Sequence, residues 1–254
     1  MKKLELIALE GIPLIEEGDD LVEIILSAIK RNKISLSNGD VLVVAQKIIS
    51  KSEGRYASLN DVKPSQQAID LSIETDKDPK LVQLILNESK EVVRYRKGVI
   101  VVESILGLIH ANAGIDRSNI KSDSNNPRVL LLPEDPDKSA TELREGILKQ
   151  TNKKIGIIIN DSSGRAWRNG IVGIAIGSSG AEVLSDLKGN LDLFGNTLEV
   201  TEVGKADEVA SAASLLMGQG KEALPIVLIK GLTESEDLNG AKALIRKSSE
   251  DLFR

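Results

Sequence analysis

Cysteine is absent from the 254-residue sequence, and histidine occurs only once, at position 110. The chain therefore offers no disulfide, no thiolate nucleophile, no iron–sulfur cluster and no cysteine-ligated zinc. A single histidine also excludes an HExxH helix or a multi-histidine metal site. Any bound metal must then be held mainly by oxygen, which favours magnesium, manganese or calcium. The lack of cysteine also fits a reducing, cytoplasmic location.

Aromatic side chains are scarce as well, since only five residues are Phe, Tyr or Trp. The interior must then be built from Ile, Leu, Val and Ala, and an aromatic residue outside the apolar runs needs another explanation. Trp167, the only tryptophan, lies in the polar segment NDSSGRAWRNG (160–170). Tryptophan usually occupies a core or a binding surface, so this segment is a candidate functional loop.

Long apolar runs and an excess of positive charge are also missing. No apolar run approaches the roughly 20 residues that cross a bilayer. Glu5 and Glu10 interrupt the N-terminal apolar stretch, so we predict neither a membrane span nor a signal peptide. The net charge of −5 and the pI near 5.2 argue against nucleic acid as a partner.

Short apolar runs typical of buried strands alternate with helical patterns along the chain. Several runs are apolar at consecutive positions, which predicts strands covered on both faces. The pattern indicates a mixed α/β (α+β) protein that forms one catalytic unit over 1–254, with two subdomains and a hinge near 121–128. The predicted strands are 40–46, 97–104, 127–133, 154–160, 170–177, 196–200 and 225–231, and the predicted helices are 20–31, 79–90, 140–152, 206–217 and 239–252.

The ends of three predicted helices carry recognisable signals. Asp78 before Pro79 places an N-cap ahead of a proline at the first helical position. Ser139 with Glu142 fits a capping box for the helix at 140–152. Gly218 is expected to end the helix at 206–217, whose small residues allow another backbone to come close.

Basic residues follow the apolar strand in VAQKIISKSEGR (44–55). Two interpretations of Lys47, Lys51 and Arg55 stay open at this point. They lie on a solvated helix or loop that merely follows a strand, or they form a cradle for an anionic ligand.

A second polar segment, HANAGIDRSN (110–119), comes after the run GVIVVESILGLI. Asp116 and Asn119 either belong to a functional site or cap a helix that begins near Arg117. His110, taken alone, is more often a structural histidine than a ligand or base, so we leave it out of the predicted active site.

The third segment is NDSSGRAWRNG, in which Asp161 and Ser162 directly follow the strand pattern IGIIIN. Ligands of α/β sheets usually bind at the carboxyl ends of strands, and two oxygens there suit a hard cation. Arg165 and Arg168 add guanidinium groups that suit phosphate or carboxylate, and Trp167 offers a face for stacking.

The segment MGQGKEAL (217–224) has a glycine-rich turn and a lysine, but it lacks the GxxxxGK[ST] spacing of a P-loop. The chain also has no GxGxxG motif after a strand. Any nucleotide must therefore be bound by a different route. The residues alone thus predict a divalent metal and a polyanionic ligand at basic loops that converge on strand ends.

Seven blocks together carry a family resemblance: GIPLI, VVAQKIISKSEGR, HANAGIDRSN, LLPEDPDKSA, NDSSGRAWRNG, VGIAIGSSG and ADEVASAASLLMGQG. In this order they resemble the gamma-glutamyl ligases of the deazaflavin coenzyme F-420, in the stand-alone form without a fused nitroreductase domain. The resemblance implies a mixed α/β fold that is neither P-loop nor Rossmann, assembled as an intertwined homodimer.

The resemblance also implies a reaction. Such enzymes use GTP and a divalent metal, magnesium or manganese with two ions per site, to add L-glutamate to coenzyme F-420-0 and to extend the tail through gamma links. The acceptor carboxylate is phosphorylated, and the glutamate amine then displaces phosphate from the acyl phosphate. A monovalent cation such as K⁺ is a further candidate cofactor. The alternative hypothesis is a non-catalytic, metal-dependent binding protein for a phosphorylated cofactor.

Site residues carried over by motif follow from the same resemblance. Arg165 and Arg168 are the expected catalytic residues. Ser162, Ser163 and Ala166 depart from the usual D-T-F/H-G-R-P-W-R motif, and Gln219 is neutral where a carboxylate is expected. The implied metal ligands are Asp116 and Asp161 for one ion and Ser162 and Gln219 for the other, and the implied nucleotide site comprises Ile12, Pro13, Leu14, Ile15, Gln46, Lys47, Lys51, Asn119, Met217, Gly218, Gly220, Lys221, Glu222, Ala223 and Leu224.

Overall fold

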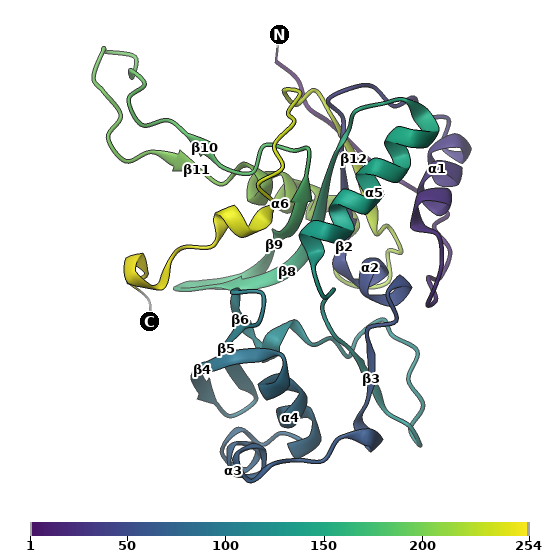
Figure 1. The fold of residues 1–254 in the computed structure, drawn as a ribbon, viewed down its shortest axis with the longest axis vertical. Helices are drawn as coiled ribbons and strands as arrows, with labels where there is room; N and C mark the ends of the chain where they lie inside the picture. The colour runs from purple at the N-terminus through teal and green to yellow at the C-terminus, as the bar shows by residue number, and fades with distance from the viewer. Residues whose placement is uncertain (1, 253–254) are drawn as a thin grey trace.

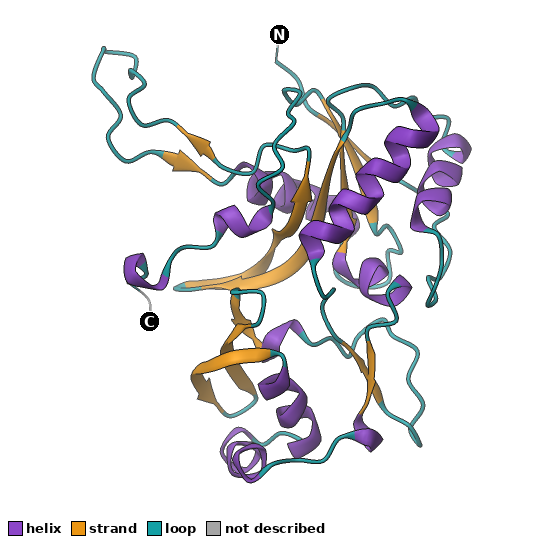
Figure 2. Ribbon diagram, viewed as in Figure 1, coloured by secondary structure: helices purple, strands orange, loops and turns teal. Residues whose placement is uncertain are grey.

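The computed structural model describes residues 2–252, and its main feature is a five-stranded sheet (Figures 1 and 2). The sheet has the order β1-β12-β2-β8-β9, and only the β2–β8 pair in this sheet is parallel. This mostly antiparallel order differs from a doubly wound parallel sheet. The strands are β1 (Glu5–Ala8), β12 (Ile226–Lys230), β2 (Val41–Ala45), β8 (Gly156–Arg165) and β9 (Arg168–Ser179).

Helices cover both faces of this sheet, so the predicted α/β class is confirmed. Successive side chains of a strand point to opposite faces. Leu42 and Val44 therefore pack in one core, and Val41 and Val43 pack in the other. One face carries α1 (Leu21–Arg31), α2 (Gln46–Ser52) and α5 (Pro136–Thr151), and the opposite face carries α6 (Lys205–Met217).

Helix α6 lies close against the sheet because its inner side chains are small. Ala206, Ala210 and Ala213 are fully buried there. A side chain in place of Gly173 on β9 would collide with Ser214 of this helix. Gly218, with a φ of +68°, ends α6 as predicted and directs the chain into the next loop.

A smaller lobe is formed by the chain between α2 and α5, and it is drawn below the sheet in Figure 1. It has its own apolar core, which includes Val82, Ile85, Ile100 and Val102. Arg55 joins it to the body, because it pairs with Glu88 (3.2 Å) and donates to the carbonyl of Leu132 (2.9 Å), whose side chain packs in the core beneath α1, α2 and α5. Its elements are β3 (Tyr56–Ser58), α3 (Gln66–Thr75), α4 (Pro79–Asn87), β4 (Ser89–Arg96), β5 (Val99–Ser104), β6 (Ile109–Ala111) and β7 (Arg128–Leu130).

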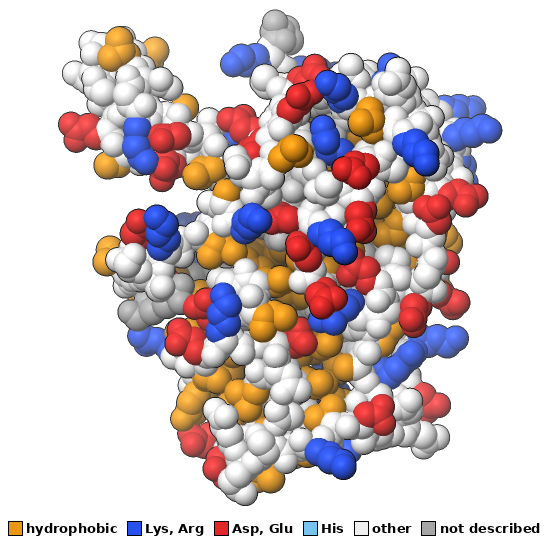
Figure 3. Space-filling view, viewed as in Figure 1, with side chains coloured by type: hydrophobic (Ala, Val, Ile, Leu, Met, Phe, Trp, Pro, Cys, Tyr) orange, Lys and Arg blue, Asp and Glu red, His pale blue; other side chains and the backbone are white. Residues whose placement is uncertain are grey.

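Two further segments project from the body. The arm formed by β10 (Ser185–Asp186) and β11 (Glu202–Val203) carries Leu193 and Phe194, which are 99% and 89% exposed (Figure 1). The C-terminal segment that follows β12 contains two short 3₁₀ turns, Ala241–Leu244 and Ser248–Glu250. Figure 3 shows acidic and basic side chains interspersed on this face of the molecule.

The structure corrects several local predictions. Residues 196–200 are not a strand, because Thr197 meets only Leu191 in an isolated bridge and Val200 is exposed. No long helix spans 239–252, since Ala241 is the one apolar side chain of the two turns that is fully buried. A helix lacking an apolar stripe gains little from packing.

Helix boundaries also differ from those expected. Helix α5 begins at Pro136 with Asp135 as its N-cap, so Ser139 is an interior residue and not part of a capping box. Helix α4 ends at Asn87, and the chain continues as β4. Between residues 2 and 252, none of the helices is both long and apolar enough to cross a bilayer. The predicted subdomain hinge near 121–128, which lies in the loop before β7, stays a prediction.

Candidate functional site

The site begins where the parallel pairing of β2 with β8 ends. Ala45 pairs with Asn160 at the last step of this parallel ladder. The next residues along the chain are Gln46, the first residue of α2, and Asp161, which is still within β8, so both lie at the carboxyl edge of β2. This edge is where α/β sheets usually bind ligands.

Asp116 reaches the same edge from the smaller lobe. Its backbone exchanges two hydrogen bonds with Leu130, each 2.9 Å long, which fixes its position. The Gln46 side chain donates from Nε2 to Asp116 Oδ2 at 2.7 Å, and Lys47 Nζ lies 3.1 Å from Oδ1. No helix begins near Arg117, so the capping interpretation of Asp116 is wrong.

A buried hydroxyl sets the orientation of Gln46. Ser50, one helical turn further along α2, donates from Oγ to Gln46 Oε1 at 3.0 Å. Ser50 is fully buried and Gln46 nearly so. Because the amide oxygen is used by Ser50, the amide nitrogen faces Asp116. Sequence reasoning missed Ser50, although its spacing of four residues on a helix is the available signal.

The two carboxylates at this edge, Asp116 and Asp161, both have a raised pKa. Burial raises the pKa of Asp161 to about 7. The charge of Asp116 also raises this pKa, whereas the hydrogen bond from the Ser162 backbone amide and the charge of Lys47 lower it. Burial also raises the pKa of Asp116, although Lys47, Gln46 and Lys51 oppose the shift. Two acidic groups that share a partly buried site favour a cation between them.

Lys51 completes the basic side of this edge. Burial, and then the nearby charge of Lys47, lower its pKa. Its Nζ donates to the Asn119 carbonyl at 2.8 Å, and Lys47 donates to Ser118 Oγ at 3.0 Å. Both lysines are therefore turned toward the 116–119 loop, which supports the cradle interpretation of the segment 44–55. Arg55 instead holds the two lobes together.

The loop after α6 closes the site from the opposite face of the sheet. Ser162 Oγ donates to Gln219 Oε1 at 2.9 Å, and Asn119 Nδ2 donates to the Gly220 carbonyl at 3.1 Å. The Gly220 amide in turn donates to Glu222 at 2.7 Å. We define the site cluster as Gln46, Lys47, Lys51, Asp116, Asn119, Asp161, Ser162, Gln219, Gly220 and Glu222.

Other predicted site residues lie outside this cluster. Arg165, Trp167 and Arg168 form the tip of the β8–β9 hairpin, where Trp167 is 88% exposed with a φ of +63°. Arg165 donates to the Asn169 carbonyl at 3.1 Å. Arg165 comes four positions after Asp161 on the same strand, a distance of about 13 Å along an extended chain. Their catalytic role stays a prediction.

The segment Ile12–Ile15 lies in the loop between β1 and α1. Ile15 is buried in the core, whereas Leu14 is 90% exposed. The end of this loop meets α2, because the Gly18 amide donates to the Ser52 carbonyl at 2.9 Å. Met217 packs in the core under α6. The structure thus places Pro13, Gly218, Lys221, Ala223 and Leu224 on loops beside these elements, and their contact with a nucleotide stays a prediction.

Comparison with known proteins identifies the family of this chain. Residues 11–231 match the family model described as F420-0:Gamma-glutamyl ligase. The chain is 42% identical to the coenzyme F420:L-glutamate ligase of Methanothermobacter thermautotrophicus over 99% of both chains. It is 45% identical to the enzyme of that name from Methanococcus maripaludis strain C7, over 99% of this chain and 98% of the relative. It is 41% identical to the enzyme of that name from Archaeoglobus fulgidus, over 99% of this chain and 97% of the relative. The chain therefore belongs to the F420-0:gamma-glutamyl ligase family.

Proposed function

We propose that this protein is a GTP-dependent ligase that adds L-glutamate to coenzyme F420-0 and extends the gamma-linked tail. Family membership supports the ligation of glutamate to the coenzyme. The observation that carries the finer proposal is the site cluster, in which Asp116, Asp161 and two lysines meet where the parallel pairing of β2 with β8 ends. Phosphoryl transfer between anions needs this kind of charge neutralisation and little acid–base chemistry.

The site cluster fits a hard divalent cation. Asp116 and Asp161 supply carboxylate groups whose pKa burial raises, and a cation between them would stabilise their charged forms. Ser162 and Gln219 supply neutral oxygens beside them. Within residues 2–252 no group of three or more His, Asp or Glu side chains is arranged to hold a metal, so the neutral oxygens and water would have to complete the ligand set. Magnesium or manganese bound there would neutralise charge that develops on the transferred phosphoryl group.

The basic residues of the site cluster would bind the polyphosphate. Lys47 and Lys51 are the cations nearest to Asp116, and each turns toward the 116–119 loop. The backbone amides of the 217–224 turn would bind phosphate oxygens without a P-loop. In the proposed reaction an acceptor carboxylate oxygen attacks the gamma-phosphorus and GDP leaves. The glutamate amine then attacks the acyl carbon, phosphate leaves and the amine loses one proton.

The proposal includes a homodimer. Leu193 and Phe194 on the arm and Trp167 on the hairpin tip are large apolar side chains that project into solvent on separate hairpins. Exposed apolar groups of this size on projecting elements are typical of association surfaces. Light scattering coupled to size-exclusion chromatography should give twice the chain mass, and a monomer at micromolar concentration would contradict this part of the proposal.

Phosphate release from GTP tests the reaction. We expect release only when the F420-0 acceptor, L-glutamate and a divalent metal are all present. EDTA should stop it, and magnesium or manganese should restore it. Full activity in EDTA would contradict the metal proposal, and equal kcat/KM with ATP would contradict the guanine preference.

The alternative is a binding protein for a phosphorylated cofactor that uses the same site cluster without turnover. It predicts metal-dependent binding of the acceptor but no phosphate release under any combination of substrates. A cytoplasmic location, a K⁺ requirement and tail extension stay proposals that enzyme assays and localisation would test separately.

A further inference from the structure

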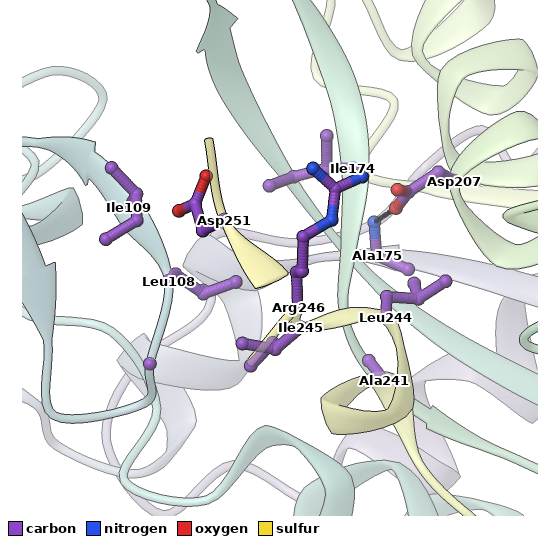
Figure 4. Close-up of a pocket in the computed structure, with 11 residues that line it drawn as sticks. Leu108, Ile109, Ile174, Ala175, Asp207, Ala241, Leu244, Ile245, Arg246 and Asp251 are labelled. Atoms are coloured by element: carbon purple, nitrogen blue, oxygen red, sulfur yellow. Dashed lines mark hydrogen bonds between the residues drawn. The ribbon is translucent and has the colours of Figure 1, made fainter. Parts of the chain in front are cut away.

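A cavity lies at the outer edge of the central sheet, beside β9. It encloses about 180 Å³ between the β5–β6 turn, the start of α6 and the C-terminal segment (Figure 4). A cavity of about 150 Å³ can hold a molecule as large as benzene, so this volume suits a small organic ligand. The residues used below are Ile109, Ile174, Leu244, Asp207, Arg246 and Asp251.

This cavity adjoins the site cluster across one strand. Ile174 of β9, which lines the cavity, pairs directly with Asp161 of β8. Residues that face each other across an antiparallel pair have Cβ atoms about 4.5–5.5 Å apart. Sheet order places α2 and the 116–119 loop on the β2 side of Asp161 and the cavity on the β9 side. A ligand in the cavity therefore lies next to the site cluster without occupying the predicted nucleotide site.

The charges around the cavity are mixed. Arg246 carries the one positive charge among the described lining residues, and Figure 4 shows its guanidinium pointing toward β9. Asp207, on the first turn of α6, accepts from the Ala175 amide at 2.8 Å, and burial raises its pKa. Asp251 approaches from the C-terminal segment. Ile109 and Leu244 supply apolar walls.

We infer that this cavity binds the amino-acid co-substrate, with Arg246 holding a carboxylate and Asp207 and Asp251 receiving the ammonium group. A guanidinium forms paired hydrogen bonds with a carboxylate, and the apolar walls suit a methylene chain. The inference rests on the proposed function, because that reaction needs an amine next to the activated acceptor carboxylate. The cavity supplies a place for that amine one strand away from Asp161.

Direct binding tests the inference without turnover. L-Glutamate should bind to the full chain, measured by calorimetry or by saturation-transfer NMR. Arg246→Gln removes the guanidinium and should weaken binding by roughly 10- to 100-fold, the usual effect of a hydrogen bond to a charged group. Arg246→Lys keeps the charge but loses the fork and should give an intermediate loss. Lys247→Gln is the matched control, because Lys247 is an exposed neighbour that does not line the cavity.

Ligands that lack one charge test the opposite side of the cavity. Glutarate has no ammonium group, and it should bind more weakly than L-glutamate to the wild-type protein. In turnover assays Arg246→Gln should raise the KM for L-glutamate and leave the KM for GTP unchanged.

Two results would overturn the inference while leaving the proposed ligase intact. One is an L-glutamate affinity that Arg246→Gln leaves unchanged. The other is active ligation in which Arg246→Gln and the wild-type protein have the same KM for L-glutamate. Binding of L-glutamate that depends on Arg246, in a protein that never releases phosphate, would instead support the cavity and contradict the ligase. Absence of any L-glutamate binding to the wild-type protein, alone or with GTP and metal, would overturn the cavity assignment.

Discussion

The two ends of the segment 160–170 have opposite surroundings, although they form one continuous motif. Asp161 lies in the site cluster, beside side chains that come from three distant parts of the chain. Arg168, seven residues later, lies at an exposed hairpin tip. The difference arises because β8 is buried between β2 and β9 as far as Asn160 and then extends beyond the edge of β2. Adjacency in sequence is thus a weak guide to which of these residues share a site.

The largest effect is expected from the two carboxylates of the site cluster. Asp116→Asn and Asp161→Asn should each lower turnover roughly 10²-fold or more, if each removes about 3 kcal/mol of transition-state stabilisation. The double mutant should lose little beyond either single mutant, because both side chains serve one metal. Turnover at saturating manganese and thermal melts with and without metal would measure this.

The control for the two carboxylate variants is an acidic residue far from the site cluster in sequence. Glu145→Gln, an exposed acid on α5, should leave turnover unchanged. If the turnover loss of the double mutant equals the product of the two single losses, the two carboxylates act at different sites. Asp161 would then share no site with Asp116, and its difference from Arg168 would disappear.

His110 lies in the smaller lobe, which brings Asp116 to the site cluster, and its contribution to stability should fall in mild acid. Burial of His110 on β6 lowers its pKa to about 4, from an ordinary value near 6.5. Between these values the unfolded chain binds a proton that the folded chain does not, so stability falls as the pH falls. From pH 6.5 to 5 this amounts to about 1.6 kcal/mol, or roughly 15-fold in the unfolding equilibrium. Because His110 is the only histidine, one imidazole NMR signal reports its titration directly.

Replacement of that histidine provides the check. Compared with the wild-type protein, His110→Gln should lose less stability to urea between pH 6.5 and 5, by the amount given above; this difference isolates His110 from Asp161, whose pKa, raised to about 7, acts in the opposite direction over the same range. An imidazole that titrates near pH 6.5 in the folded protein would contradict the prediction.

A smaller effect on turnover is expected from Ser50, which donates to Gln46 and to none of the predicted metal-ligating residues. Ser50→Ala frees the Gln46 amide to rotate, so that its hydrogen bond to Asp116 is no longer enforced. Turnover should fall about tenfold, equivalent to about 1.4 kcal/mol. The matched control is Ser52→Ala on the same helix, whose hydroxyl donates to the Ile49 carbonyl.

The readout for Ser50 must separate positioning from folding. We expect the loss to appear as a higher metal concentration for half-maximal rate, with a melting temperature close to that of Ser52→Ala. Equal rates in the two variants would show that Gln46 needs no support.

The smallest effect is expected at the hairpin tip. Arg168→Lys keeps the charge and loses the planar fork, so it should lower kcat/KM by a few-fold, roughly threefold to fivefold, and leave the fold intact. Steady-state kinetics with light scattering would show whether the loss follows dimer assembly. A loss as large as that of Asp161→Asn would mean that the tip reaches a reacting group, and wild-type kinetics would remove Arg168 from the catalytic residues.

The sequence predicted the sheet well where both faces of a strand are buried. Runs such as 40–46 and 154–160 are apolar at consecutive positions, and α6 was visible from its small residues and Gly218. Strand β4 (Ser89–Arg96) was missed because its exposed polar residues and register shifts break the alternation. The C-terminal segment was predicted as a helix, so the cavity beneath it had no signal in the sequence.

The site was predictable in its parts and not in its assembly. Apolar runs that end in polar residues placed Lys47 and Asp161 at strand ends. Asp116 joins them because of the path that the smaller lobe takes. Only the family resemblance implied that Asp116 belongs to the same site. Ser50 has no chemistry of its own and becomes visible only through its bond to Gln46.

The position of β12 has a consequence for how the protein folds during synthesis. This strand lies between β1 and β2, so the first strand of the chain is paired only with one that is made near the end. On the ribosome, β1 must wait unpaired while more than two hundred residues emerge. The β8–β9 hairpin, by contrast, closes locally and rapidly, whereas these distant pairings form slowly. Chain release, rather than the local hairpin, therefore marks the moment at which the sheet and its carboxyl edge become complete.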